Sequence, residues 1–246
     1  MWTMELSYTL KHNKKLRKMS LPIVVIACKV FQGLLEKYFP NGRIKQITFL
    51  EYGLHSIPKK LNGALQEQID KINEPSVIVL GYGLCGNGLH QIRSDKHILL
   101  IPRVDDCIAI FLGSYQTYLQ QFNNFPGTYY LSKGWLEAGS NPLDEYQKYV
   151  QEYGSETATW IMYQQYRNYK RLAFVVHQNS ELITYGQKAK EIADYCTRWG
   201  MKYEEIIGSN TYIRQLVKVA FALDRAGEDF IVVPPGGQLI QQDFIR

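Results

Sequence analysis

Short apolar runs recur along the chain, and each is followed by turn residues and then by a segment with helical periodicity. This alternation is typical of β-α-β units, in which crossover helices cover both faces of a parallel sheet. The clearest apolar runs are 23–28, 47–50, 77–80, 97–101, 172–176, 203–207 and 230–233. The pattern therefore predicts an α/β protein built from parallel sheets with flanking helices.

The order strand, helix, strand, helix, strand, glycine-rich turn occurs twice, which indicates two Rossmann-like βαβαβ lobes. We expect a first lobe over residues 21–135 and a second over 171–246, joined by a tyrosine-rich helical connection over 136–170. Residues 1–20 contain five Lys or Arg residues and one Glu, and we expect them to form a basic, flexible extension.

The net charge of +5 is concentrated in that extension, so the rest of the chain is almost neutral and we expect no nucleic-acid partner. A nucleic-acid or membrane-surface arm is the alternative for the basic run 11–18. The apolar runs are shorter than the ~18–20 residues that span a bilayer, and residues 1–20 lack the apolar core of a secretory signal. Four cysteines in 246 residues are too few for a disulfide scaffold. We therefore expect a cytoplasmic protein with free thiols and no membrane contact.

Three of the four cysteines fall where predicted strands end. Cys28 closes the first strand, Cys85 lies in the loop after the third, and Cys107 follows the fourth. The carboxyl ends of parallel strands lie along one edge of a sheet, where open α/β sheets bind their ligands. Because thiolates bind zinc and iron–sulfur clusters, we predict that these three cysteines are metal ligands. Packing in the core is the alternative for each, and it is our interpretation of Cys196 on its amphipathic helix.

The loop that carries Cys85 is rich in glycine. Glycine allows the backbone to approach a ligand closely, and backbone N–H groups after a strand can bind phosphate. The candidate cofactor-binding residues are therefore Gly83, Gly86, Asn87 and Gly88. Neither the dinucleotide-binding glycine pattern nor a P-loop is present, so a tight turn is the alternative.

Three polar residues near the same edge are candidates for catalysis. His90 shares its loop with Cys85, where an imidazole can act as a ligand or as a general acid or base. Asp106 adjoins the third cysteine, and Arg103 can neutralise an anionic substrate. The structural alternatives are a histidine satisfied by its surroundings and an ion pair between Arg103 and Asp105 or Asp106.

Segments 81–88, 101–114 and 127–135 carry motifs that resemble domain-of-unknown-function family 1638. The resemblance extends from about Leu21 to Gln238, and the family's cysteine positions are matched by the three cysteines at the strand ends. Members of that family occur in anaerobic bacteria and methanogenic archaea, often beside corrinoid-dependent methyltransferase systems. The resemblance thus implies a role in anaerobic methyl-group or corrinoid metabolism, without a defined activity.

Two functions of different classes follow from these patterns. In the first, the three thiols hold an iron–sulfur cluster or zinc, with one coordination position open for a small-molecule substrate. In the second, a non-catalytic accessory protein binds a corrinoid protein or a methyltransferase through the aromatic-rich region 129–169. A thiol enzyme with Cys85 or Cys107 as nucleophile is a third hypothesis, but it lacks a clearly placed histidine base.

Overall fold

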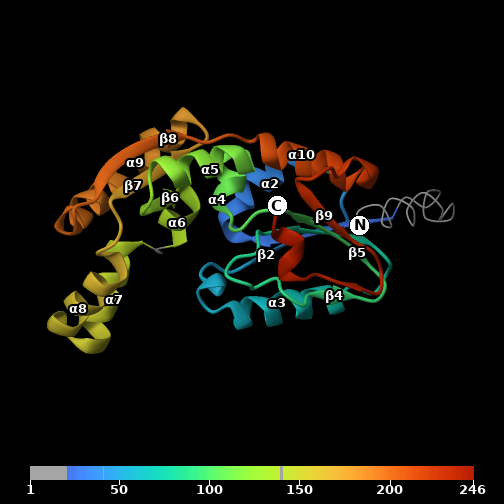
Figure 1. The fold of residues 1–246 in the computed structure, drawn as a ribbon, viewed down its shortest axis with the longest axis horizontal. Coiled ribbons are helices and arrows are strands. Elements are labelled where there is room, and N and C mark those ends of the chain that lie inside the picture. Colours follow the sequence, from blue (N-terminus) through green and yellow to red (C-terminus); the bar gives the residue numbers. More distant parts are fainter. Residues whose placement is uncertain (1–20, 41, 139–140) are drawn as a thin grey trace. The chain divides into compact units, whose positions relative to one another are not determined.

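The computed structural model describes residues 21–40, 42–138 and 141–246, and the chain forms two compact units (Figure 1). The first unit combines the chain up to Cys107 with Tyr212–Arg246, and the second is Ile108–Thr211. The basic extension expected over residues 1–20 lies outside the described residues.

A five-stranded sheet with the order β2-β1-β3-β5-β9 forms the centre of the first unit. Its strands are β1 (Ile23–Cys28), β2 (Gln46–Leu50), β3 (Val77–Gly81), β5 (Ile98–Pro102) and β9 (Phe230–Val233). Strands β2, β1, β3 and β5 run parallel, and β9 pairs antiparallel with β5. Every residue of β1, β3 and β5 is buried, as expected for parallel strands that are covered on both faces. The predicted parallel strands that precede the three cysteines are confirmed as neighbours.

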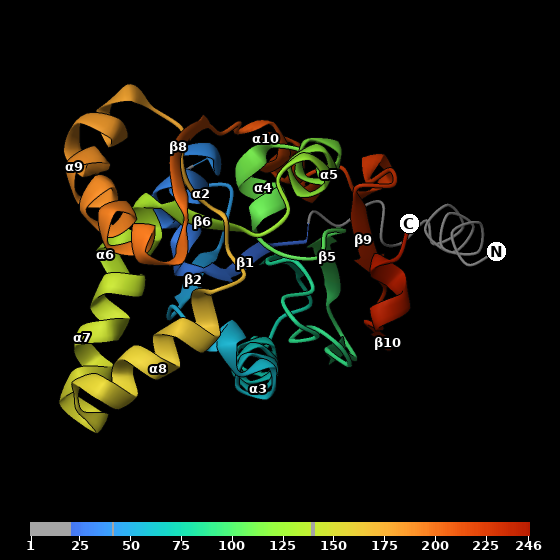
Figure 2. The ribbon, with the colours of Figure 1, turned by 60° about the vertical axis from the view of Figure 1, so that its left-hand side comes forward.

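Helices cover both faces of this sheet. They are α2 (Gln32–Tyr38), α3 (Pro58–Asp70) and α10 (Thr211–Ala220). Helices α2 and α10 lie on one face and α3 on the other (Figure 1 and Figure 2). Strands β2 and β3 lie on opposite sides of β1, so the two crossovers run in opposite directions along the sheet. Because both crossovers are right-handed, α2 and α3 cover opposite faces of the sheet. Arg214 of α10 lies over the Tyr38 ring, 5.1 Å from its centroid, which ties α10 to α2.

Short elements complete the first unit. A two-stranded antiparallel ribbon pairs β4 (Arg93–Ser94) with β10 (Gly237–Gln238). The short 3-10 helices are η1 (Lys29–Phe31), η2 (Leu54–Ser56), η4 (Leu223–Arg225) and η5 (Gln241–Phe244). The ribbon fastens the C-terminal segment to the chain between β3 and β5.

The second unit contains a parallel sheet of three strands in the order β6-β7-β8. These strands are β6 (Thr128–Ser132), β7 (Arg171–Val176) and β8 (Lys202–Ile207). The helical elements are α4 (Ile108–Leu112), α5 (Tyr115–Asn124), α6 (Lys133–Ala138), α7 (Pro142–Tyr153), α8 (Ser155–Tyr166), α9 (Asn179–Cys196) and η3 (Thr197–Trp199). In the described parts of the chain, no helix combines the length and the apolar character that crossing a membrane requires.

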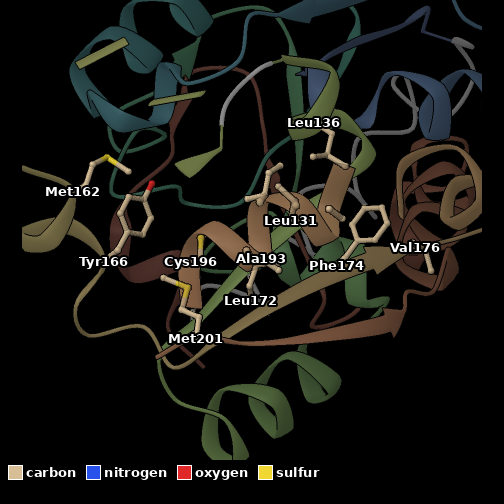
Figure 3. Packing of buried hydrophobic residues seen from close by; sticks show 12 residues of the cluster. Leu131, Leu136, Met162, Tyr166, Leu172, Phe174, Val176, Ala193, Cys196 and Met201 are labelled. Carbon is tan, nitrogen blue, oxygen red and sulfur yellow. The ribbon is translucent and has the colours of Figure 1, made fainter. Parts of the chain in front are cut away.

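The two faces of β7 have different partners because side chains alternate along a strand. Leu172, Phe174 and Val176 belong to a hydrophobic cluster with α9. Figure 3 shows Cys196 within this cluster, and the interpretation of Cys196 as a core residue is confirmed. On the other face, the Arg171 guanidinium donates a 2.7 Å hydrogen bond to the side chain of Gln121 in α5.

The tyrosine-rich region expected as a connection over 136–170 is an integral part of the second unit. Helices α7 and α8 are separated by Gly154, whose φ of 79° lies in the left-handed region that favours glycine. Met162 and Tyr166 of α8 are buried in the cluster that also holds Cys196. Because their apolar side chains complete this core, the two helices pack against one unit instead of bridging two.

The chain after residue 211 corrects the expected second lobe over 171–246. Strand β9 pairs with β5, with Leu100 opposite Val232, so it belongs to the sheet of the first unit. That sheet is consequently mixed and not purely parallel. An apolar run predicts that a strand exists, but its partner depends on the path of the chain through α10.

We predict that residues 108–211 fold as an isolated fragment, because their sheet and core come entirely from this range. Thermal unfolding followed by circular dichroism should show a cooperative transition. A matched fragment of residues 136–246 lacks β6 and should show none. A cooperative transition only in the second fragment would contradict the division described above.

Candidate functional site

The three strand-end cysteines meet at one edge of the first unit's sheet. Cys28 is the last residue of β1, Cys85 follows β3, and Cys107 follows β5 and directly precedes α4. Since β1, β3 and β5 are adjacent and parallel, their carboxyl ends lie side by side. Cys28 and Cys85 both interact electrostatically with Cys107, and Cys28 also interacts with Cys85. The structure thus brings the three thiols into one neighbourhood.

Two backbone hydrogen bonds tie the loop after β3 to the loop after β5. The Leu84 N–H donates to the Val104 carbonyl and the Cys85 N–H to the Asp105 carbonyl, both at 2.9 Å. Gly83 makes this approach possible, because a Cβ at residue 83 would lie 2.8 Å from the Val104 oxygen. The two loops therefore position Cys85 and Cys107 together.

Cys85 has an uncommon backbone conformation. Its φ of 48° lies in the left-handed region, which a non-glycine residue adopts at an energetic cost. Gly86 and Asn87 have positive φ as well, and the Gly88 N–H closes the turn by donating to the Cys85 carbonyl at 3.1 Å. Such strain persists only where the surrounding structure fixes it, and here the bond between the Cys85 N–H and Asp105 does so.

The surroundings of the three thiols favour their neutral form. Burial raises the pKa of Cys28 to about 11. Burial, and then the charge of Asp106, raise the pKa of Cys85 to about 12. The pKa of Cys107 is also raised well above its ordinary value, by burial first and then by Cys85 and Asp106. In the protein without a metal, all three side chains are therefore thiols at neutral pH.

Hydrogen bonds from backbone N–H groups oppose the effect of burial, because they lower the pKa of two of the thiols. Those of Val30 and Lys29 lower the pKa of Cys28, and those of Gly83 and Cys107 lower the pKa of Cys85. Hydrogen bonds of this kind stabilise a thiolate, and they also tune iron–sulfur clusters. The backbone N–H groups thus stabilise the thiolate form of these two cysteines, which burial disfavours.

Tyr82 belongs to this site, although no sequence pattern singled it out. It is 3% exposed, and its hydroxyl has no hydrogen-bond partner among the residues that the structure describes. Burial raises the pKa of this hydroxyl, and its interactions with Cys28, Cys85 and Cys107 raise it further. Its position between Gly81 and Gly83 was the available signal, since two glycines leave room for one bulky side chain at a strand end.

The candidates for catalysis lie in different surroundings. Asp106 interacts electrostatically with Cys85 and Cys107. His90 accepts a 3.2 Å hydrogen bond from the Gln241 N–H through Nδ1. Arg103 donates a hydrogen bond to the Ile245 carbonyl. The C-terminal segment thus contacts both His90 and Arg103. Catalytic roles for these two residues and for Asp106 stay predictions.

The glycine-rich loop has a mainly structural explanation. A Cβ at Gly88 would lie 2.6 Å from Cδ2 of Leu61 in α3, so Gly88 allows the loop to pack on that helix. Gly83 allows contact with the neighbouring loop, as described above. Gly86 and Asn87 are exposed. Cofactor binding by this loop stays a prediction, with Gly86 and Asn87 the residues open to a ligand.

The donor chemistry of the three thiols suits a soft metal, but their arrangement does not identify a metal site. Among the residues that the structure describes, no group of three or more His, Cys, Asp or Glu side chains is arranged to hold a metal ion. Three thiols, N–H groups that act on their sulfurs and an orphaned tyrosine hydroxyl fit a thiolate-bound group. Metal binding therefore stays a prediction.

The family described as "Protein of unknown function (DUF1638)" matches residues 49–217, which is more than half of the 246-residue chain. The chain belongs to this family. The resemblance found in the sequence is thereby confirmed. Cys85 and Cys107 of this DUF1638 protein lie within the matched range, and Cys28 precedes it. No curated protein and no solved structure matches the chain.

We predict that Gly83→Ala lowers the free energy of unfolding by about 1–3 kcal/mol, because its methyl group would press on the Val104 oxygen and the Asp106 backbone. The control is Gly63→Ala in α3, where no atom lies within 4 Å of the added Cβ. Alanine in this exposed helical position should stabilise the protein by about 0.5–1 kcal/mol. Urea denaturation measures both changes, and no loss of stability in Gly83→Ala would contradict the close loop contact.

Proposed function

We propose that this DUF1638 protein binds an iron–sulfur cluster through Cys28, Cys85 and Cys107. The observation that carries the proposal is the meeting of three thiols at the ends of three adjacent parallel strands. Core packing does not require this arrangement, and thiolates are the usual ligands of such clusters. Three cysteines would leave one iron of a four-iron cluster without a protein ligand, and therefore open to a small-molecule substrate.

A cluster suits this site better than zinc does. A single zinc ion needs all its sulfur ligands at about 2.3 Å from one point. In a cluster of several irons the cysteines bind different metal atoms, so the thiols lie farther apart. The three thiols here interact electrostatically, yet they are not gathered in a group that holds one ion. We prefer the cluster because thiolates from three adjacent strand ends can bind different iron atoms, and zinc is the alternative.

The residues of the chain would have separate tasks in such a site. The strand ends and the paired loops hold the three sulfurs, and the backbone N–H groups near Cys28 and Cys85 stabilise the thiolates. Because the free thiols are protonated at neutral pH, binding would release protons, and affinity would rise with pH. When bound, a cluster of this kind supplies Lewis-acid or electron-transfer chemistry at its open iron.

We extend the proposal to anaerobic methyl-group or corrinoid metabolism. Its support is the genomic setting that the family resemblance implies, beside corrinoid-dependent methyltransferase systems. An oxygen-sensitive cluster suits an anaerobic cell. The substrate class within that metabolism is a small molecule able to reach an open iron.

A second candidate function is docking to a corrinoid protein or a methyltransferase. One observation favours it: three aromatic side chains of α7 and α8 are exposed, namely Tyr153 at 55%, Trp160 at 63% and Tyr163 at 49%. Exposed aromatic residues are enriched at protein interfaces. The expected surface over 129–169 is nevertheless reduced, because Tyr129 and Tyr166 pack in the core of the second unit.

Anaerobic purification followed by iron, sulfide and zinc analysis and a visible spectrum tests the cluster. We expect iron and sulfide in the wild type, and their loss in Cys28→Ser, Cys85→Ser and Cys107→Ser because each removes one ligand. Cys196→Ser is the matched control, since this buried thiol lies in the core of the second unit and should not change metal content.

Melting curves of the same variants separate loss of ligand from loss of fold. Equal metal content in all variants, or zinc without iron in the wild type, would overturn the cluster proposal. In the first of these cases docking would be the better candidate.

A further inference from the structure

Strand β2 is an edge of the first unit's sheet, and within the described ranges only β1 pairs with it. The Val77 N–H donates to the Pro22 carbonyl at 3.0 Å, so the even-numbered residues of β1 direct their backbone groups to β3. The odd-numbered residues of β1 therefore bond to β2. Because Val25 lies opposite Ile47, the backbone N–H and C=O groups of Ile47 and Phe49 point away from the sheet.

This edge lacks the features that usually prevent a further strand from pairing. Proteins protect exposed edges with proline, with bulges or with a covering helix or loop. Strand β2 contains neither proline nor glycine, and all five of its residues pair with β1 in continuous register. The outward backbone groups are therefore arranged to accept another strand.

A hollow with a volume of about 300 Å³ lies beside this edge, on the face of the sheet that α3 covers. Its apolar floor is formed by Val24 and Ile26 of β1, which are each 1% exposed. Its walls come from β2, from the end of α3 and from the chain around them, namely Lys45, Gln46, Thr48, Gln68, Lys71, Ile72, Asn73 and Glu74. The hollow thus adjoins the free edge along the first half of β2.

The charges of the lining residues favour an anionic group in this hollow. Two lysines line it, whereas Glu74 is its one acidic lining residue. Lys45 pairs with Glu74 at 2.8 Å. Lys71 pairs at 2.6 Å with Glu67, which lies outside the lining, and both of these side chains are largely exposed to solvent. The Lys71 ammonium group is therefore available for a carboxylate that enters the hollow.

We propose that β2 and the hollow together bind an extended, acidic peptide segment of another protein. The segment adds a strand to the sheet through the outward backbone groups of Ile47 and Phe49, and it places one Asp or Glu side chain in the hollow near Lys71. Backbone hydrogen bonds of this kind give affinity, and a hollow beside the strand gives sequence preference. This interaction is independent of the proposed cluster.

The same charges disfavour a second copy of the chain as the occupant. Pairing of two β2 edges would bring together two hollows that each have a surplus of lysine, and like charges across an interface oppose association. Lys45 directly precedes β2, and lysine beside an edge strand is a common protection against self-pairing. An acidic peptide meets the opposite charge.

Selection from a display library of random peptides on the immobilised full-length protein tests the proposal. We expect the selected peptides to be rich in β-branched residues and to carry an acidic residue at a fixed position. Synthetic peptides of these sequences serve as probes in calorimetry. N-methylation of every second backbone amide should abolish binding when it removes the N–H groups that face β2, and methylation of the intervening amides should have little effect.

Three variants locate the site on the protein. Lys71→Glu should weaken binding of the acidic peptide roughly tenfold or more, because it reverses the charge in the hollow. Lys60→Glu is the matched control, since this exposed lysine of the same helix does not line the hollow, and its affinity should stay unchanged. Ile47→Pro removes an outward N–H that β1 does not use and should abolish binding. Melting curves show whether this variant remains folded.

Several results would overturn the proposal: a selection that enriches no peptide, equal binding of both N-methylated series, or an unchanged affinity in Lys71→Glu. A dimer in sedimentation that Ile47→Pro dissociates would show that a second copy occupies the edge. Cys85→Ser should bind the peptide as the wild type does, so loss of the metal site and loss of the peptide site are distinguishable.

Discussion

The candidate site depends on the backbone hydrogen bonds that join the loops after β3 and β5. They link Leu84 to Val104 and Cys85 to Asp105, and they continue the contact between two neighbouring parallel strands beyond the sheet. Without them Cys85 would have no reason to adopt its left-handed conformation beside Cys107. Only glycine at position 83 leaves room for this contact. The placement of Cys85 beside the loop that leads to Cys107 follows from this pair of hydrogen bonds.

Burial of the three cysteine side chains determines their protonation state. Loss of hydration keeps them protonated in the free protein, and Asp106 adds to this effect at Cys85 and Cys107. A bound metal would reverse the balance, because a cation stabilises the thiolates that the protein alone disfavours. The N–H groups that act on Cys28 and Cys85 would then strengthen the site. The protonation of the three thiols therefore depends on the balance between burial and these N–H groups.

Much of the first unit could be predicted from the sequence because its signals are local. Apolar runs specify β1, β3 and β5, and parallel topology then gathers Cys28, Cys85 and Cys107 at one edge. The partner of β9 could not be predicted, since antiparallel pairing with β5 depends on contacts distant in sequence. The unpaired hydroxyl of Tyr82 was also hidden, because the lack of a partner among the described residues becomes evident only when its neighbours are known. His90 and Arg103 lie near the site in sequence, but the C-terminal segment that contacts them comes from the far end of the chain.

The central claim is that Cys28, Cys85 and Cys107 bind one metal cluster together. An anaerobic crystal structure with anomalous scattering recorded at the iron edge tests it most directly. We expect one compact iron peak bonded to all three sulfurs. Three free thiols in protein that carries iron elsewhere, or no iron at all, would contradict the claim.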